Sequence, residues 1–244
     1  MRLLIVRHGD PNYEIDSLTE KGWREASLLA KRLSKLDIKA FYTSPLGRAK
    51  DTARDTLQMM NREVEELEWL QEFFRAQINR PDVTEHTSIS WDWLPQDWTT
   101  DPRYYDVDKW MTTDIMANST VASEYQWVAD GIDELLEKHG YRRNGNYYDV
   151  VKPNRDTIVL FCHFGVECVI LSHLLHVSPM VLWHGFCAAP TSVTTIYTEE
   201  RRQGIASFRV ASFGDVSHLY VENEPPAFSA RFCETYDCKE ERHD

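Results

Sequence analysis

The amino-acid sequence predicts an α/β protein, built as a three-layer α/β/α sandwich around a mostly parallel central sheet. Short aliphatic runs at residues 3–6 and 158–161 have the length and continuity of strands that are buried on both faces. Helical patterns follow both runs along the chain, and strands that alternate with helices are typical of a parallel sheet covered on its faces. We expect residues 1–244 to form one domain, because this length suits one large α/β unit.

The first third of the chain contains three predicted strands and two predicted helices. Residues 3–6 form a strand that ends in a polar loop, and apolar residues at 26, 29, 30 and 33 then follow the i, i+3, i+4, i+7 spacing of an amphipathic helix that begins near Thr19. Residues 40–43 read as the second strand. Ser44 suits the N-cap and Pro45 the first position of the next helix. Residues 63–70 are predicted to form a third, short strand, with the end of the preceding helix as the alternative.

The second half of the chain contains the clearest strand of the sequence, at residues 158–161, and an apolar helix from Gly165 to His176. Residues 193–197 and 205–211 are two further predicted strands, separated by a turn at residues 199–204. From about residue 222 the composition predicts an irregular C-terminal tail.

Residues 75–118 interrupt this alternation. They contain Trp91, Trp93, Trp98, Trp110, three prolines and many acidic residues, without a sustained strand or helix period. We expect an insertion over one end of the sheet. Its tryptophans are predicted to form a small satellite core, and the segment is also placed to act as a lid over a binding site, which is compatible with that core.

Charge and composition exclude several classes of protein. With 39 acidic against 27 basic side chains, the net charge of −12 argues against a dedicated nucleic-acid binder. No apolar run approaches the roughly 18 residues of a membrane span, and Arg7 ends the first run too early for a signal peptide, so we expect a cytoplasmic protein. The five cysteines lack C-x-x-C spacing, which predicts reduced thiols and neither a disulfide framework nor a structural zinc site.

Three residues stand where open α/β sheets bind ligands, just beyond the carboxyl ends of strands. His8 lies within Arg7-His8-Gly9 after the first strand, where the glycine lets the backbone approach a ligand closely, and His163 follows the strand at 158–161. Arg48 falls in the first turn of a predicted helix, a position that favours an anion. Taken singly, each has a structural alternative: a surface basic pair, a buried structural histidine, or an arginine paired with a nearby aspartate.

Together, five segments in this order and spacing resemble the histidine phosphatase superfamily, also called the phosphoglycerate mutase-like fold. The segments are Leu4-Ile5-Val6-Arg7-His8-Gly9, Leu18-Thr19-Glu20-Lys21-Gly22, Ser44-Pro45-Leu46-Gly47-Arg48-Ala49-Lys50-Asp51-Thr52-Ala53, Leu70-Gln71-Glu72 and Cys162-His163-Phe164-Gly165. The resemblance covers most of the chain except residues 75–118 and the tail.

The resemblance implies a catalytic role for His8, as the nucleophile that takes up a phosphoryl group, and for Glu72, as the acid and base. It implies that Arg7, Arg48 and His163 surround that group and need no metal ion or cofactor; Gly9 and Asn12 are further candidate contacts to the phosphate. The competing interpretation of Glu72 is a solvated glutamate, since Glu63, Glu65, Glu66 and Glu68 are close in sequence.

The function implied is metal-independent hydrolysis of a small anionic phosphate ester through a phosphohistidine. Phosphoglycerate mutase-type phosphoryl transfer is the alternative among enzymes, and a non-catalytic phospho-ligand binding domain is the alternative outside them. The expected partner is a small phosphorylated substrate, with neither a nucleic acid nor a membrane. The sequence leaves the oligomeric state open.

Overall fold

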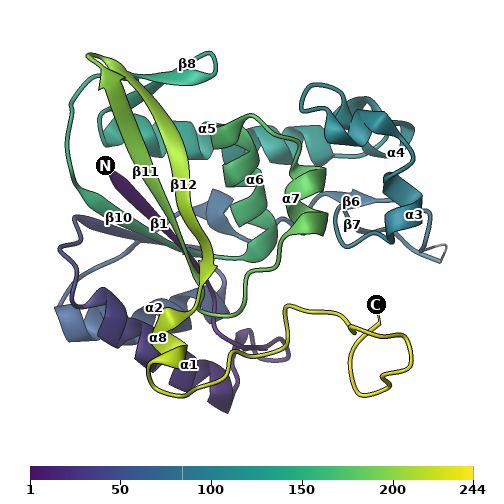
Figure 1. The fold of residues 1–244 in the computed structure, drawn as a ribbon, viewed down its shortest axis with the longest axis horizontal. Helices are drawn as coiled ribbons and strands as arrows, with labels where there is room; N and C mark the ends of the chain where they lie inside the picture. Colours follow the sequence, from purple (N-terminus) through teal and green to yellow (C-terminus); the bar gives the residue numbers. More distant parts are fainter. Residues whose placement is uncertain (84, 244) are drawn as a thin grey trace.

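The computed structural model describes residues 1–83 and 85–243, and its centre is an eight-stranded mixed sheet with helices on both faces (Figure 1). Along the sheet the strands are β5 (Glu65–Glu66), β4 (Ala40–Thr43), β10 (Thr157–Cys162), β1 (Arg2–Arg7), β11 (Val193–Arg202), β12 (Ile205–Asp215), β9 (Tyr147–Val150) and β8 (Tyr141–Asn144). Two small hairpins lie outside it: β2 (Pro11–Asn12) with β3 (Ser17–Leu18), and β6 (Gln77–Ile78) with β7 (Ser88–Ile89).

The sheet divides into a parallel and an antiparallel half. Strands β5, β4, β10 and β1 are parallel neighbours, whereas β11, β12, β9 and β8 continue from β1 in antiparallel pairs. The prediction of a mostly parallel sheet therefore describes only the first half. Two of these antiparallel pairs, β8–β9 and β11–β12, are hairpins whose tight turns contain Gly145 (φ 59°) and Gly204 (φ 81°) in left-handed conformations.

The predicted three-layer arrangement is confirmed. Helices α1 (Glu20–Leu33), α2 (Gly47–Met60) and α8 (Ser217–Tyr220) lie on one side of the sheet in Figure 1, and α5 (Val121–Lys138), α6 (Phe164–Leu175) and α7 (Pro179–Gly185) lie on the other. Successive side chains of β1 point to opposite faces of the sheet. Leu4 and Val6 pack in the core under α1 and α2, whereas Leu3 and Ile5 pack in the core under α5 and α6.

The predicted strands and helices are largely present, but several of their bounds differ. Helix α2 begins at Gly47 with Leu46 as its N-cap residue, so the prediction of Ser44 and Pro45 at its start is wrong. Strand β11 continues to Arg202, because pairing with β12 extends far into the predicted turn. Within 63–70 only Glu65–Glu66 is strand, and the 3₁₀ turn η1 (Glu68–Leu70) follows it.

The long helix α5 was not predicted from the sequence, and neither was the β8–β9 hairpin. Buried residues at 125, 128, 129, 132, 135 and 136 give α5 an apolar face toward the core. Gly131 lies in the middle of this face, where a β-carbon would come within 2.4 Å of the Trp69 ring. The glycine weakens the local helical signal but admits a tryptophan against the helix.

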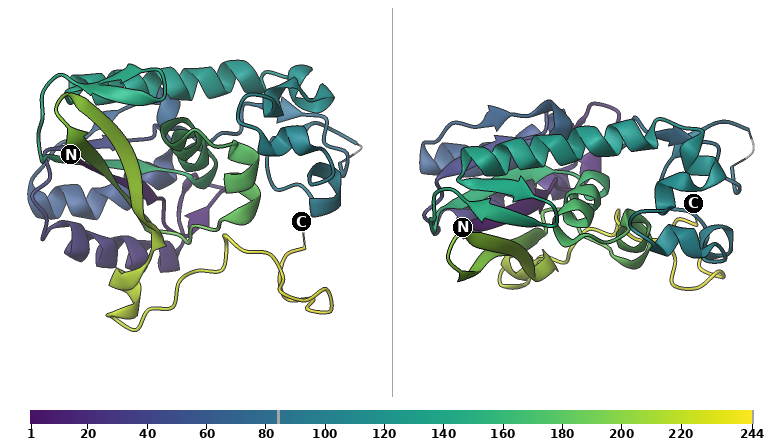
Figure 2. Two further views of the ribbon diagram at one scale, coloured as in Figure 1. Left: turned by 45° about the horizontal axis from the view of Figure 1, so that its top comes forward. Right: turned by 90° about the horizontal axis from the view of Figure 1, so that it is seen from above.

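The insertion at residues 75–118 projects from one end of the molecule (Figure 2). It contains β6, β7 and four short helices, namely α3 (Pro95–Trp98), η2 (Pro102–Tyr105), η3 (Trp110–Thr112) and α4 (Asp114–Ala117). Trp93, Trp98 and Trp110 are buried in the same core as α5 and α6, and Trp110 packs edge-on against Trp183 at 5.8 Å. The expected satellite core is therefore an extension of the main core.

The C-terminal tail contains no helix or strand over residues 222–243. It starts beside α1, where the Ala227 amide donates to Glu25 (2.9 Å), and the other carboxylate oxygen of Glu25 accepts from the Asp10 amide (3.1 Å). Its end lies beneath the insertion in both views of Figure 2, and Arg242 there approaches Asp92 at 3.8 Å. None of the described helices combines the length and apolarity that crossing a membrane requires.

Candidate active site

The two candidate histidines meet at the carboxyl edge of the parallel half of the sheet. Strands β1 and β10 are neighbours with Arg7 opposite Cys162, so the residues that follow, His8 and His163, emerge side by side. Their ring centroids are 5.0 Å apart with a 58° angle between the planes, and both side chains are buried. The sheet register thus brings together two residues that are 155 positions apart.

His8 is held as a neutral imidazole with a defined tautomer. Its Nδ1 lies 2.8 Å from the carbonyl oxygen of Gly9, and because a carbonyl only accepts, Nδ1 carries the proton. The pKa of His8 is well below its ordinary value, first because the ring is buried and then because of the charge of Arg7. The Nε2 lone pair is therefore available as a nucleophile at neutral pH.

His163 is oriented by Ser44, which lies at the end of the neighbouring strand β4. The Ser44 hydroxyl accepts from the Leu46 amide (3.2 Å) and lies 2.8 Å from Nε2 of His163. Burial and the nearby cationic groups hold the pKa of His163 well below its ordinary value, so the ring is neutral. In the tautomer that accepts the Ser44 hydroxyl at Nε2, the Nδ1 of His163 carries the ring proton and is the remaining donor.

Two arginines flank the histidines. Arg7 donates to the carbonyl of Ala188 and lies 5.8 Å from the centroid of the Phe164 ring. Arg48, in the first turn of α2, donates from Nη1 to Asp16 (2.5 Å), and the same carboxylate accepts from the Gly47 amide (2.6 Å). These contacts hold one side of each guanidinium group in place.

Among residues 1–83 and 85–243, three buried nitrogens at this place find no hydrogen-bond partner: Nε of Arg7, Nε of Arg48 and Nδ1 of His163. Both arginine charges act on His8 and on His163, so the two guanidinium groups are close enough to influence both rings. Buried donors without partners are costly, and two of these belong to cationic groups. The cluster therefore has the chemistry of an anion receptor, within a protein of net charge −12.

Glu72 lies at the same site, directly after η1 and beside the N-terminus of α6. Its Oε1 accepts from the backbone amides of Phe73 (2.7 Å) and Val166 (3.1 Å), and the charges of Arg7 and Arg48 act on it. Burial nevertheless raises the pKa of Glu72 above its ordinary value. A carboxyl whose protonated form is favoured by burial is suited to general acid and base chemistry.

The glutamates that compete with Glu72 in sequence are in solvent. Glu63, Glu65, Glu66 and Glu68 are exposed, and Glu65 and Glu66 form ion pairs with surface lysines. Only Glu72 of this group makes electrostatic contact with both site arginines.

Two of the candidate phosphate contacts have other functions in the fold. Gly9 is required by packing, since a β-carbon there would lie 2.9 Å from the Gly22 carbonyl of α1, and its amide donates to Thr52 (2.9 Å). Asn12 accepts from the Glu14 amide (3.2 Å) in an exposed turn. Within residues 1–83 and 85–243, no contact joins the Asn12 side chain to the histidines or arginines.

The sequence reasoning missed two positioning residues. Ser44 was interpreted as a helix cap, although its place at a strand end beside His163 was a signal for a role in the site. Asp16 carried no signal, because its contact with Arg48 depends on a left-handed backbone (φ 47°) in the loop after β2. In the insertion, Arg80, Arg103 and Lys109 form ion pairs with Asp82, Asp101 and Asp106.

Comparison with known proteins agrees with this geometry. The curated phosphoserine phosphatase 1 of Hydrogenobacter thermophilus is 23% identical over 235 residues, which cover 91% of this chain and 97% of that protein. A 2,3-bisphosphoglycerate-dependent phosphoglycerate mutase of Thermoplasma acidophilum is 37% identical over 71 residues, which cover 25% of this chain and only 36% of the mutase.

Solved structures share the fold over most of its length. A phosphoserine phosphatase from Entamoeba histolytica, solved with phosphoserine, matches with a TM-score of 0.57 at 20% identity, covering 89% of this chain and 98% of that one. A mycobacterial glucosyl-3-phosphoglycerate phosphatase matches with a TM-score of 0.56 at 20% identity, covering 87% and 98%. The family model of the histidine phosphatase superfamily (branch 1) matches residues 3–210, and the chain belongs to that superfamily.

Proposed function

We propose that this protein is a metal-independent phosphomonoester hydrolase that acts on a small anionic phosphate ester through a phosphohistidine at His8. The observation that carries the proposal is the group of buried donors without partners on Arg7, Arg48 and His163, beside a neutral imidazole. A phosphoryl group fits this chemistry, because the donors stabilise the charge on its oxygens while Nε2 of His8 attacks the phosphorus.

The proposed reaction has two steps. In the first, Nε2 of His8 forms a bond to phosphorus, the ester P–O bond breaks, and Glu72 gives its proton to the leaving oxygen. In the second, Glu72 takes a proton from water, the water oxygen attacks phosphorus, and the P–N bond breaks to release inorganic phosphate and regenerate His8. The raised pKa of Glu72 suits both proton transfers.

Hydrolysis is preferred over phosphoryl transfer between isomers. The two phosphatases matched over most of their length support it, whereas the match to the mutase covers 36% of that protein. We also propose that residues 1–244 act as one catalytic domain, with residues 75–118 as the lid on the leaving-group side, and that the protein is cytoplasmic, which its free cysteines suit.

The test is release of phosphate from p-nitrophenyl phosphate in excess chelator, with wild type compared with His8→Ala. We expect turnover that resists the chelator and falls to background in the variant, with a phosphoenzyme that is labile to acid trapped only in wild type. Turnover by His8→Ala near the wild-type rate contradicts the mechanism. Phosphoglycerate interconversion that depends on a bisphosphoglycerate primer, without net hydrolysis, would replace it with the mutase reaction.

A further inference from the structure

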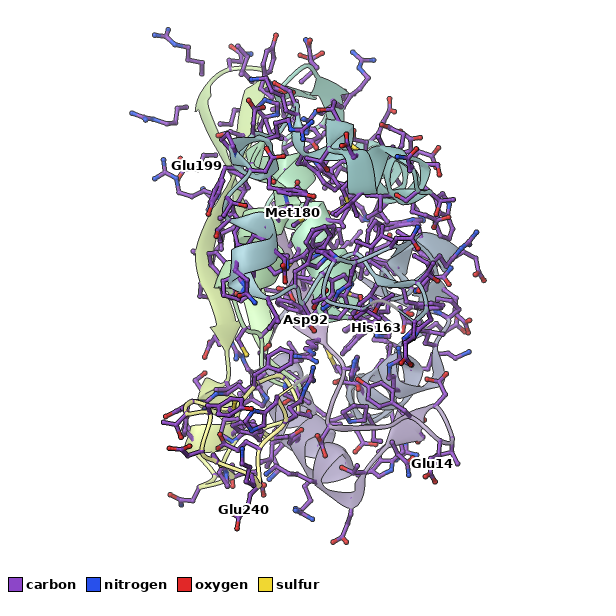
Figure 3. The ribbon with its side chains drawn as sticks, turned by 90° about the vertical axis from the view of Figure 1, so that its right-hand side faces the viewer. Glu14, Asp92, His163, Met180, Glu199 and Glu240 are labelled. Carbon is purple, nitrogen blue, oxygen red and sulfur yellow. The ribbon has the colours of Figure 1, made fainter. Side chains whose placement is uncertain are left out.

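Helix α6 carries a buried carboxyl that has no part in the proposed reaction. His163 is labelled at mid-height in Figure 3, and α6 begins at the residue that follows it. Glu167 lies one turn into the helix, where its amide donates to the carbonyl of His163 (3.1 Å). Glu167 is 1% exposed, and a carboxylate that is buried to this extent needs either compensation of its charge or a proton.

The fold brings Glu167 close to the guanidinium of Arg7. Arg7 follows Ile5 by two residues on β1, so both side chains point to the face of the sheet that α6 covers. Phe164 and Glu167 are three residues apart on α6 and lie on one side of the helix. Arg7 lies 5.8 Å from the centroid of the Phe164 ring, and its charge acts on Glu167. The carboxyl is therefore placed near a proposed phosphate donor, on the α6 side of the sheet.

Strand β11 supplies a hydrogen bond to the Glu167 carboxyl. Thr194 is the register partner of Ile5, and side chains directly opposite one another share a face of the sheet. The Thr194 hydroxyl accepts from the Gly214 amide (3.1 Å) and donates to the carboxyl. Oε1 of Glu167 has no hydrogen-bond partner within the described part of the chain. The carboxyl is thus incompletely satisfied, and burial raises the pKa of Glu167 to about 7 although the hydrogen bond opposes this.

Other titratable groups near the Glu167 carboxyl are Glu72, from the loop after η1, and the thiols of Cys162 and Cys168. Burial raises the pKa of both thiols well above the ordinary value, so they are neutral at physiological pH. The charge of Glu72 raises the pKa of Glu167 further, because like charges disfavour ionisation. Near neutrality, Glu72 is therefore a group from which Glu167 has to be distinguished.

The insertion adds one more carboxyl near the same guanidinium. Trp91 packs edge-on against Phe164 at 5.9 Å, and the charge of the next residue, Asp92, interacts with that of Arg7. Burial raises the pKa of Asp92 from its ordinary value. Asp92 is therefore the second carboxyl that an experiment on Glu167 has to keep constant.

We propose that Glu167 is a positioning residue that acts through Arg7: its carboxylate attracts the guanidinium while the site is empty, and it takes up a proton from solvent when a phosphoryl oxyanion binds there. The physical reason is that two anions then compete for one guanidinium in a buried site, and a like charge disfavours the ionised carboxyl. Protonation removes the repulsion and leaves the guanidinium to the oxyanion. The inference rests on the proposed function, because the oxyanion must bind at Arg7, Arg48 and His163.

The proposal couples anion binding to pH with a definite sign. Below about pH 6, Glu167 is protonated in both the empty and the occupied site, so binding takes up no proton there. Above about pH 7 the empty site holds the carboxylate, so binding has to take up a proton and the affinity falls as the pH rises. We expect Glu167→Gln to bind sulfate about 10-fold more tightly than wild type at about pH 8, and equally at about pH 6.

The experiment is titration calorimetry with sulfate in two buffers of different ionisation enthalpy, which counts the protons taken up on binding. Sulfate stays a dianion across this pH range and is not hydrolysed, so neither the ligand nor turnover contributes protons. Wild type is expected to take up as much as about one proton more than Glu167→Gln at about pH 8. The same pair is compared in the Glu72→Gln background, where the neighbouring carboxyl is neutral. Asp92 is present in all of these proteins, so its contribution cancels.

Glu25→Gln is the matched control. Glu25 of α1 is another buried carboxyl, and burial raises its pKa to about 7 as well, but its hydrogen bonds come from the backbone amides of Asp10 and Ala227. Its variant is expected to keep the proton uptake of wild type.

A second variant decides the matter if Glu167→Gln fails to fold. Thr194→Val removes the hydrogen bond that favours the carboxylate, so the onset of proton uptake is expected at a higher pH than in wild type. Sulfate binding with the same proton uptake in wild type and Glu167→Gln, or an unchanged onset in Thr194→Val, overturns the role of Glu167. Absence of sulfate binding by wild type contradicts the anion receptor itself, and hydrolysis of p-nitrophenyl phosphate by the same protein tests the proposed function independently.

Discussion

A β-carbon on residue 165 would lie 2.5 Å from Oε1 of Glu72, so the acid fits against the start of α6 only because residue 165 is glycine. The same oxygen accepts from the amide of Val166, the next residue. The loop after η1 and the first turn of α6 are therefore packed against each other at the carboxylate. The position of Glu72 depends on the absence of one side chain on another element.

Gly165→Ala is expected to displace Glu72 and lower kcat by at least about 10-fold, because misplacing a proton donor by an ångström is costly in rate. The measurement is steady-state hydrolysis of an alkyl phosphate, together with a thermal melt. Gly185→Ala is the matched control, since a β-carbon there meets nothing within 4 Å. Equal activity of the two variants would show that Glu72 tolerates the displacement.

Glu72→Gln is expected to lower kcat/KM for an alkyl phosphate by roughly 10²- to 10⁴-fold, the usual contribution of general acid catalysis. The loss should be much smaller for p-nitrophenyl phosphate, because a nitrophenolate leaves without needing a full proton. An equal loss with both esters would show that Glu72 acts on binding rather than on the leaving group.

The pH profile follows from the same residue. Burial raises the pKa of Glu72, and only its protonated form can donate, so kcat/KM for the alkyl ester should fall as the pH rises through that pKa. Glu72→Gln has no such group and should lack this limb, while the titrations of the substrate phosphate and of Glu167 remain common to both profiles. A limb of wild-type depth in the variant would assign the titration to another group.

Ser44→Ala is expected to weaken phosphate binding by roughly 10-fold, because His163 then loses the hydroxyl that fixes its tautomer. The readout is the inhibition constant of inorganic phosphate together with KM, since a purely structural defect would lower the melting temperature without changing these constants. Ser44→Thr keeps a hydroxyl and should restore binding. The exposed Ser123→Ala serves as the control.

The sequence was informative wherever chemistry follows directly from a strand. Short continuous apolar runs of this length are typical of buried strands, so β1, β4 and β10 were predicted from the sequence. Because the carboxyl ends of parallel strands lie at the same edge of a sheet, the residues that follow β1 and β10 were expected to meet there. The sequence therefore predicts both His8 and His163 as residues of the candidate site. Arg48 was selected for its place in a first turn, although the helix begins two residues later than predicted.

Contacts between distant loops were not predictable in the same way. The position of Asp92 depends on a left-handed backbone that is held by Arg80, and the contact of Arg242 depends on the course of an irregular tail. Neither contact is accompanied by a periodic pattern in the sequence from which it could be predicted. Strands β11 and β12 were both predicted, but the extension of β11 beyond Thr198 was not, because its last residues are charged and largely exposed.

The residues at the candidate active site come from two different parts of the fold, the central sheet with its helices and the insertion. The proposed phosphate donors come from the ends of buried strands and the first turn of a helix. Trp91 and Asp92 come from the insertion, which projects from one end of the molecule (Figure 2), and the tail approaches it through the ion pair of Arg242 with Asp92. Substrate range can therefore diverge through changes in these two segments while the phosphoryl chemistry is inherited unchanged.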